Sequence, residues 1–311
     1  MPEPAHLRTM GAGGEAVAAN ADKLRKTLGY PAVPAPITAG FYDNHTHFDF
    51  AYGDEPLHYL DQLALAEQAG ARGVVQVGVT LESSKWSAAL AAEDPRVLAA
   101  VALHPNEAPE YGNLANLDEA IAEIAELAKQ PRVRAIGETG LDFFRTEGDG
   151  ALELQRYSFE RHIEIAKEND IALMIHDRDA HDEVVDTLLR VGAPDRVVFH
   201  CYSGDVELAE ICNSHGWYMS FAGNITIKRN QGLRDSVLAA RPELRLIETD
   251  APFLSPEPYR GRPNASYLVP ITLRFMAGLV SGQGAEVDES AVDVLAAELC
   301  ANTERVYGSW K

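Results

Sequence analysis

The sequence predicts an α/β protein built as a closed (β/α)8 barrel, the TIM barrel. From residue 40 onward, short β-like runs alternate with amphipathic segments, and eight such repeats fit into roughly 270 residues. Five of the ten histidines directly follow apolar, β-type runs, a placement that brings them together where parallel strands end. An open doubly wound sheet is the alternative, but no GxGxxG turn follows the first strand.

The eight expected strands are short runs bounded by turn signals. They cover residues 40–44, 73–77, 97–103, 134–137, 171–175, 197–199, 218–221 and 244–248. Segments such as LDEAIAEIAELAKQ and AHDEVVDTLLRVGA lie between them, with apolar residues at three- and four-residue spacing. Several of these segments end at glycine, a common helix-stop signal, so each strand is expected to be followed by a helix.

Two segments are expected to lie outside the repeats. Residues 1–40 predict an N-terminal extension, in which a helix-like stretch at about 15–28 precedes the proline-containing connector PAVPAPITAG. Residues 41–311 then form the barrel domain. The final stretch DESAVDVLAAELCANTERVYG predicts one extra helix that covers the outside or one end of the barrel.

The charge balance restricts the partners. Twenty-seven Lys and Arg against 47 Asp and Glu give a net charge of −20, which argues against broad, charge-driven attachment to nucleic acid. A polyanionic substrate would need a local basic rim, and we expect its exposed members near the mouth of the site. The candidates are Lys228, Arg229, Arg234, Arg260 and Arg262.

Other features predict a cytoplasmic protein with no membrane partner and no evident obligate protein partner. No apolar stretch approaches the roughly 18 residues that a membrane span requires. The first residues lack the basic start and apolar stretch of a secretion signal. The three cysteines show no CxxC spacing, as in a reducing compartment. Cys201 is a possible soft metal ligand, but buried filler is the favoured interpretation.

His45 and His47 form an HxH pair at the end of the first expected strand. Residues i and i+2 point the same way on a strand, so both imidazoles can reach one metal ion. Asp43 shares that face and could orient a ligand. Asp250 ends the eighth strand, beside the first, where it can complete the site and accept a proton from a water molecule. Glu248, two residues earlier, competes for that role.

Glu138, His176 and His200 follow strands four, five and six. A carboxylate can bridge two cations at the roughly 3.5–4 Å separation that two-metal hydrolysis needs, and Glu138 has the central position for it. His176 and His200 both follow apolar runs, which favours a shared ligand role. Asp142 is expected at most behind the ligands. His104 precedes a proline and is expected to contact substrate rather than metal.

The remaining histidines carry little functional signal. His6 lies in the extension, and the other four fall in helix-like patterns, where a structural role is expected. These four are His58, His162, His181 and His215.

Assembled in order, these motifs resemble the TatD family of metal-dependent deoxyribonucleases, within the amidohydrolase-like barrels. The similarity runs from about residue 41 to 308. It rests on DNHTHF, ALHP, GETGLDF, IHDRDAHDE, FHCYSGD, SFAGNIT, ETDAPFL and NTERVYG. The sequence departs from the family at Asn106, where a second histidine is common, and in RGRPNASYL, which lacks an acidic residue that often follows the asparagine.

The resemblance implies two divalent cations that share Glu138. His45, His47, Glu138 and Asp250 would hold the first, and Glu138, His176 and His200 the second. His104 would lie by the scissile phosphate, and Arg260 would contact phosphate. Cleavage of DNA, on single strands or at 3′ ends, follows from the resemblance alone. The expected catalytic residues are Asp250, His104 and Glu138.

Two alternatives share these ligands. One is a small-molecule amidohydrolase or lactonase, which the acidic composition favours. The other is a non-catalytic metal-binding protein, which would be expected to have lost ligands, whereas all six are present. The ligands suit Zn, Mn, Fe or Ni, while Mg is indicated only by the family.

Overall fold

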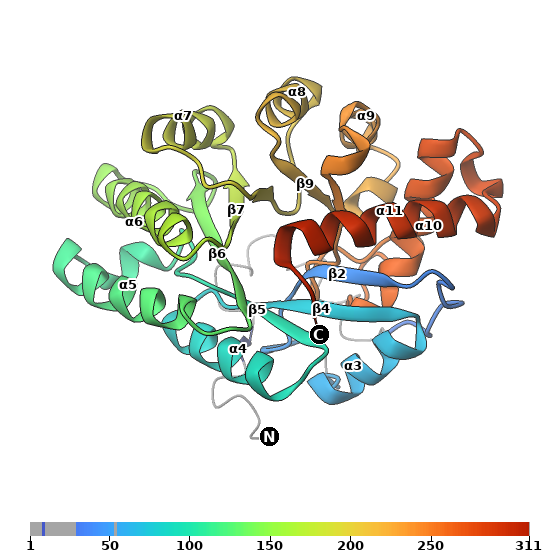
Figure 1. Cartoon of the computed structure of the whole chain (residues 1–311), viewed down its shortest axis with the longest axis horizontal. Coiled ribbons are helices and arrows are strands. Elements are labelled where there is room, and N and C mark those ends of the chain that lie inside the picture. The colour runs from blue at the N-terminus through green and yellow to red at the C-terminus, as the bar shows by residue number, and fades with distance from the viewer. Residues whose placement is uncertain (1–7, 10–28, 53–54, 311) are drawn as a thin grey trace.

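A computed structural model describes residues 8–9, 29–52 and 55–310, and within them it confirms the barrel. Eight parallel strands form one sheet in the order β10-β9-β8-β7-β6-β5-β4-β2, which curls around a central axis (Figure 1). The strands are β2 (Phe41–Thr46), β4 (Ala71–Val77), β5 (Val97–Val101), β6 (Val133–Asp142), β7 (Ala172–Arg178), β8 (Val197–Phe199), β9 (Tyr218–Phe221) and β10 (Arg245–Ile247).

Helices cover the outside of the sheet, one after each strand (Figure 1). They are α3 (Tyr59–Gln68), α4 (Leu81–Glu93), α5 (Leu114–Ala128), α6 (Asp149–Glu168), α7 (His181–Val191), α8 (Val206–His215), α9 (Gln231–Ala239) and α10 (Val269–Ser281). The expected extra C-terminal helix is α11 (Glu289–Tyr307). Each connection from a strand to its helix therefore lies at the same end of the barrel, which we call the top.

The seam between β2 and β10 closes through loop and side-chain contacts. The Asn44 amide donates to the carbonyl of Ile247 (2.8 Å), and the backbone N–H of Asp250 donates to the carbonyl of His45 (2.9 Å). Just above, the N–H of His47 donates to the carbonyl of Ala251 (2.8 Å). These bonds tie the end of the first strand to the loop after the last one.

The bottom of the barrel is closed by the C-terminal segment. Trp310 is 7% exposed and stacks on Tyr42, with ring centroids 4.2 Å apart. Its indole N–H donates to the carbonyl of Arg96 (3.1 Å), just before β5. A side chain at Gly73 would collide with this indole, because a Cβ there would lie 2.2 Å from Nε1. The apolar lower half of the barrel is therefore sealed, and polar chemistry is confined to the top.

The strand predictions are confirmed, with one informative difference. The fourth expected strand, 134–137, is the ten-residue β6, which continues through Glu138 to Asp142. The helix expected at 15–28 lies outside the described residues, and the domain boundary at residue 40 stays a prediction. The described part of the connector packs on the barrel, where the Tyr267 hydroxyl donates to the carbonyl of Pro31 (2.7 Å). Among the described residues, no helix is both long and apolar enough to cross a membrane.

The sealed bottom generates a stability prediction. We expect Trp310→Ala to lower the free energy of unfolding by about 3–5 kcal/mol, because it empties a packed aromatic site and removes the indole hydrogen bond to the Arg96 carbonyl. Chemical denaturation measures the change. Val294→Ala, at a residue of α11 that is 68% exposed, is the control and should change stability by less than about 0.5 kcal/mol. Equal stability of the two variants would contradict a structural role for the C-terminal segment.

Candidate metal centre

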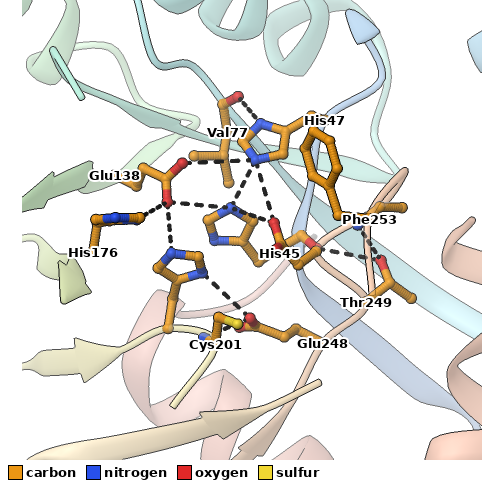
Figure 2. A network of polar contacts seen from close by, with 12 residues as sticks. His45, His47, Val77, Glu138, His176, Cys201, Glu248, Thr249 and Phe253 are labelled. Atoms are coloured by element: carbon orange, nitrogen blue, oxygen red, sulfur yellow. Dashed lines mark hydrogen bonds and ion pairs between the residues drawn. The ribbon is translucent and has the colours of Figure 1, made fainter. Parts of the chain in front are cut away.

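The predicted ligands come together at the top of the barrel (Figure 2). Three groups of ligand atoms each lie within 4.8 Å of one another. The groups are His45, His47 and Asp250; His45, Glu138 and His200; and His104, Glu138 and His176. All six predicted metal ligands and His104 thus belong to one cluster, although the grouping with His104 was not expected.

Glu138 lies at the centre of this cluster. Its Oε2 is 2.6 Å from His200 Nε2 and 3.4 Å from His176 Nδ1, while its Oε1 is 3.8 Å from His47 Nε2. The side chain of Glu138 is 7% exposed. Its two oxygens face different sets of imidazoles, which is the arrangement that a bridging ligand requires.

An irregularity in β6 presents this carboxylate. The regular pairing of β6 with β7 is interrupted between Ile136 and Thr139. Gly137 packs so closely on β7 that a Cβ there would lie 2.4 Å from the Cβ of Met174. Strand β6 therefore passes Met174 without a side chain at residue 137, and Glu138 is placed among the imidazoles.

The HxH pair is built as expected. The Nε2 atoms of His45 and His47 are 3.0 Å apart, and those atoms lie 3.7 and 3.6 Å from Asp250 Oδ1. His47 Nδ1 bonds to the carbonyl of Val77 (3.0 Å), so Nδ1 carries the proton and Nε2 presents a lone pair. His45 Nδ1 is buried without a hydrogen-bond partner. A cation between the two Nε2 atoms would relieve the close approach of these nitrogens.

His200 and His176 are each oriented by a buried carboxylate. His200 Nδ1 lies 3.3 Å from Glu248 Oε1, and His176 Nε2 lies 3.2 Å from Asp142 Oδ2. In each ring one nitrogen donates outward and the other faces Glu138, as in metal sites where a ligand histidine is held by an acceptor behind it. Asp142 thus lies behind a ligand, as predicted. Glu248 faces His200 rather than the HxH pair.

The loop after β10 fixes Asp250. Its backbone has a left-handed φ of 54°, which is unfavourable for a non-glycine residue and re-aims the carboxylate. Asp43, expected to orient a ligand, accepts from the backbone N–H of His45 (3.3 Å) and also from the hydroxyl (2.6 Å) and backbone N–H (2.9 Å) of Thr249. The Asn264 amide donates to the carbonyls of Thr249 (2.9 Å) and Phe253 (2.6 Å). These contacts hold the loop in its strained form.

The electrostatics of the cluster fit a cation. Burial opposes charge on His200, but Glu138 and Glu248 outweigh it and raise the pKa of His200 well above its ordinary value. Burial likewise opposes charge on Glu138, yet the charge of His200 and the hydrogen bonds from His176 and His200 outweigh it, so the pKa of Glu138 falls well below its usual range. For His45, burial and the neighbouring His200 lower the pKa. Once the proton of His200 is displaced, an anionic carboxylate among imidazole nitrogens is a donor set suited to divalent transition metals.

His104 differs from the ligand histidines. The backbone N–H of Asn106 donates to His104 Nδ1 (3.0 Å), so in the neutral ring the proton is on Nε2. Burial, followed by the charge of His176, lowers the pKa of His104 to about 3, which keeps the ring neutral. His104 Nε2 lies 3.3 Å from His176 Nδ1 and 3.7 Å from Glu138 Oε1. A protonated Nε2 does not bind metal but donates a hydrogen bond, as expected for a substrate contact.

Only some side chains of the predicted basic rim are exposed at the top of the barrel. Lys228 and Arg229 are exposed on the loop after β9, and Arg260 is exposed on the loop after β10, so all three lie at the top. Arg234 instead donates to the carbonyls of Ile225 (3.1 Å) and Ile227 (2.7 Å) and holds a loop in place. Substrate binding by Arg260 stays a prediction.

Sequence reasoning missed Arg178. It ends β7, two residues after His176, and its guanidinium lies 4.0 Å from the ring centroid of Phe144. Its charge opposes the effect of burial, which raises the pKa of the Cys201 thiol well above its ordinary value. The i and i+2 spacing that singled out the HxH pair applies equally to His176 and Arg178 and could have identified this cation.

Cys201 and the remaining histidines have structural surroundings. Cys201 is half-buried rather than fully buried, has a left-handed φ of 43°, and its N–H donates to Glu248 Oε1 (2.7 Å). Buried His162 bonds the backbone, with Nδ1 2.6 Å from the carbonyl of Ser158. The other described histidines cap α3, pair with Asp177 or stack on Trp217; they are His58, His181 and His215. His6 lies outside the described residues.

Comparison with known proteins identifies relatives along most of the chain. The family model described as TatD related DNase matches residues 42–308. The uncharacterized metal-dependent hydrolase TatD of Mycobacterium tuberculosis is 39% identical over 269 residues, covering 86% of this chain and 97% of that protein. The uncharacterized metal-dependent hydrolase YabD of Bacillus subtilis is 30% identical over 268 residues, covering 86% and 98%.

A solved structure agrees with these sequence matches. The crystal structure of YJJV, a TatD homologue from Escherichia coli K12, superposes with a TM-score of 0.71 at 27% identity. The match covers 86% of this chain and 98% of that one. The described barrel is therefore shared with relatives of known structure over nearly their whole length.

The raised pKa of His200 generates a pH prediction. The raised pKa favours the protonated form of His200 beside Glu138 and Glu248, so a cation that binds there would displace this proton. Metal affinity should therefore fall as pH falls, by about tenfold per unit for each displaced proton. Calorimetric titration with Mn²⁺ in buffers of different ionisation enthalpy should detect the released proton. His215→Gln, outside the cluster, should release the same number as the unaltered protein, whereas pH-independent affinity would contradict the prediction.

Proposed function

Because this chain belongs to the TatD-related DNase family of metal-dependent hydrolases, we propose that it cleaves phosphodiester bonds of DNA with two divalent cations at the described cluster. The proposed substrate is a single strand or a 3′ end. Mg²⁺ is proposed from the family, although the imidazole-rich donor set also suits Zn, Mn, Fe or Ni.

The observation that carries this proposal is the position of Glu138 between two ligand sets. His47, which groups with His45 and Asp250, has its Nε2 3.8 Å from Oε1, whereas His176 and His200 lie near Oε2, which His45 Nε2 also approaches to 4.0 Å. When bound there, two divalent cations neutralise charge on the phosphate and lower the pKa of a water molecule. The positions of the ligand side chains would set the distance between the two cations.

Asp250 is proposed to take the proton from the attacking water. Of the two predicted carboxylate ligands it is the more exposed, with a side chain 15% exposed against 7% for Glu138. Its competitor Glu248 is fully buried and accepts from His200 Nδ1 and the Cys201 N–H. Of the two carboxylates on this strand end, Asp250 is the one that water can reach.

His104 and Arg178 are proposed to bind the phosphate. His104 is neutral and presents its Nε2–H at the cluster, so it can donate to a phosphoryl oxygen without competing for a cation. Arg178 adds a cation at the end of β7, with a guanidinium suited to phosphate oxygens. Arg260, Lys228 and Arg229 would extend this positive charge along the top.

The proposed roles predict different defects in two variants. Asp250→Asn keeps the size but removes the basicity, so turnover of a single-stranded oligonucleotide should fall about 10²- to 10⁴-fold while oligonucleotide affinity changes little. His104→Ala should weaken phosphate binding and retain the metal content of the unaltered protein. Single-turnover kinetics, fluorescence anisotropy and elemental analysis provide the three readouts.

Asp186→Asn is the matched control, because Asp186 is exposed on α7 away from the cluster, and its turnover should be unchanged. Near-normal turnover of Asp250→Asn would contradict the proposed mechanism and make Glu248 the next residue to vary. Hydrolysis of ester or lactone substrates without any oligonucleotide cleavage would instead favour a small-molecule hydrolase built on the same ligands.

A further inference from the structure

An aromatic cluster lies beside the metal centre and takes no part in the chemistry described so far. We call Phe50, Tyr52 and Phe253 the aromatic rim. The ring centroids of Phe50 and Phe253 are 5.4 Å apart, and that of Tyr52 is 6.4 Å from Phe253, both in edge-to-face geometry. The rim comes from the segment after β2, which includes the two-residue strand β3 (Phe50–Ala51), and from the loop after β10; the two meet at the top of the seam.

The rim touches a metal ligand directly. The ring of His47 is 5.5 Å from that of Phe50 and 6.3 Å from that of Phe253, centroid to centroid. Figure 2 shows Phe253 next to His47, on the side of the imidazole away from Glu138. A group bound at the cations and a flat group on the rim would therefore be separated by one side chain.

The rim is held in place by backbone bonds. The N–H of His47 donates to the carbonyl of Ala251, and the buried Asn264 amide donates to the carbonyl of Phe253. Strand β3 (Phe50–Ala51) pairs in parallel with β1 (Arg8–Thr9). These contacts fix the loops before any ligand binds, which lowers the entropy lost on binding.

The exposure of the rim distinguishes it from core packing. All three rings are half-buried, whereas Phe41, Phe199 and Phe221 in the strands are at most 2% exposed. Partly exposed aromatic side chains next to a phosphate-binding centre are a common platform for nucleobases in proteins that bind single strands.

The negative net charge of this chain makes base stacking a valuable source of affinity for DNA. With a net charge of −20, the protein gains little affinity for DNA from the release of counterions. Stacking of a base on an aromatic ring does not depend on the charge of the protein, and it tolerates every base because each has a flat π face.

We propose that the aromatic rim is a nucleobase-binding subsite, where the base of the nucleotide at the metal centre stacks on Phe253 and Phe50. This inference rests on the proposed phosphodiesterase function. A base inside a duplex is stacked on its neighbours and paired, so only an unpaired base reaches the rim. The rim therefore selects single-stranded or frayed ends over intact duplex.

The test compares oligonucleotides that differ only in one base. Two single strands carry identical phosphates, but the 3′-terminal nucleotide of one has a thymine and that of the other an abasic tetrahydrofuran. The metal-loaded, full-length protein and its variants Phe253→Ala, Phe253→Tyr and Phe275→Ala are assayed for kcat/KM on both strands and on methyl p-nitrophenyl phosphate. Phe275 lies on α10, 36% exposed, and is the matched control.

We expect Phe253→Ala to lower kcat/KM on the thymine-ended strand by roughly 5- to 100-fold, while the abasic strand and the small diester are cleaved as before. Phe253→Tyr should restore the preference for the base, and Phe275→Ala should have no effect. Equal losses on both strands would show that Phe253 only supports His47, and equal cleavage of the two strands by the unaltered protein would overturn the subsite alone. If the unaltered protein cleaves neither strand, the proposed function fails and the subsite with it.

Discussion

The structure depends on one buried carboxylate in a cage of imidazoles. Five histidine nitrogens lie within 4.0 Å of the oxygens of Glu138, and the closest is 2.6 Å away. A buried carboxylate is unfavourable unless it is compensated, and protonated imidazole or the proposed cations would compensate it. The contacts around the cage serve this arrangement: Val77, Asp142 and Glu248 each fix the outward nitrogen of one ring, which leaves the other nitrogen facing the centre.

The barrel can form this site because its interior is divided into an apolar lower half and a polar upper half. The lower half is a cluster of apolar side chains, and Trp310, after the end of α11, packs on it. The upper half receives the polar ends of five strands and the strained loop that carries Asp250. Backbone bonds across the seam between β2 and β10 join the HxH pair to this loop. A site assembled from rigid strand ends holds its ligands close to the geometry that metal binding needs.

Local patterns predicted much of this architecture. Apolar runs and their turn signals predicted all eight strands, and the position of each histidine after such a run predicted which imidazoles meet. Contacts between distant segments were harder to predict. The pairing of Glu248 with His200 joins two strands that are not adjacent in the barrel, and the bond of Asp43 to Thr249 spans the seam. The aromatic rim likewise exists only because two loops meet, so no periodicity in the sequence indicates it.

The central claim is that Glu138 bridges two cations, and anomalous X-ray scattering from crystals grown with Mn²⁺ tests it most directly. The account predicts two anomalous peaks roughly 3.5–4 Å apart, one on each side of the Glu138 carboxylate. One peak should have His45, His47 and Asp250 as neighbours, and the other should have His176 and His200. A single peak at full occupancy, or two peaks that share no oxygen of Glu138, would contradict the account.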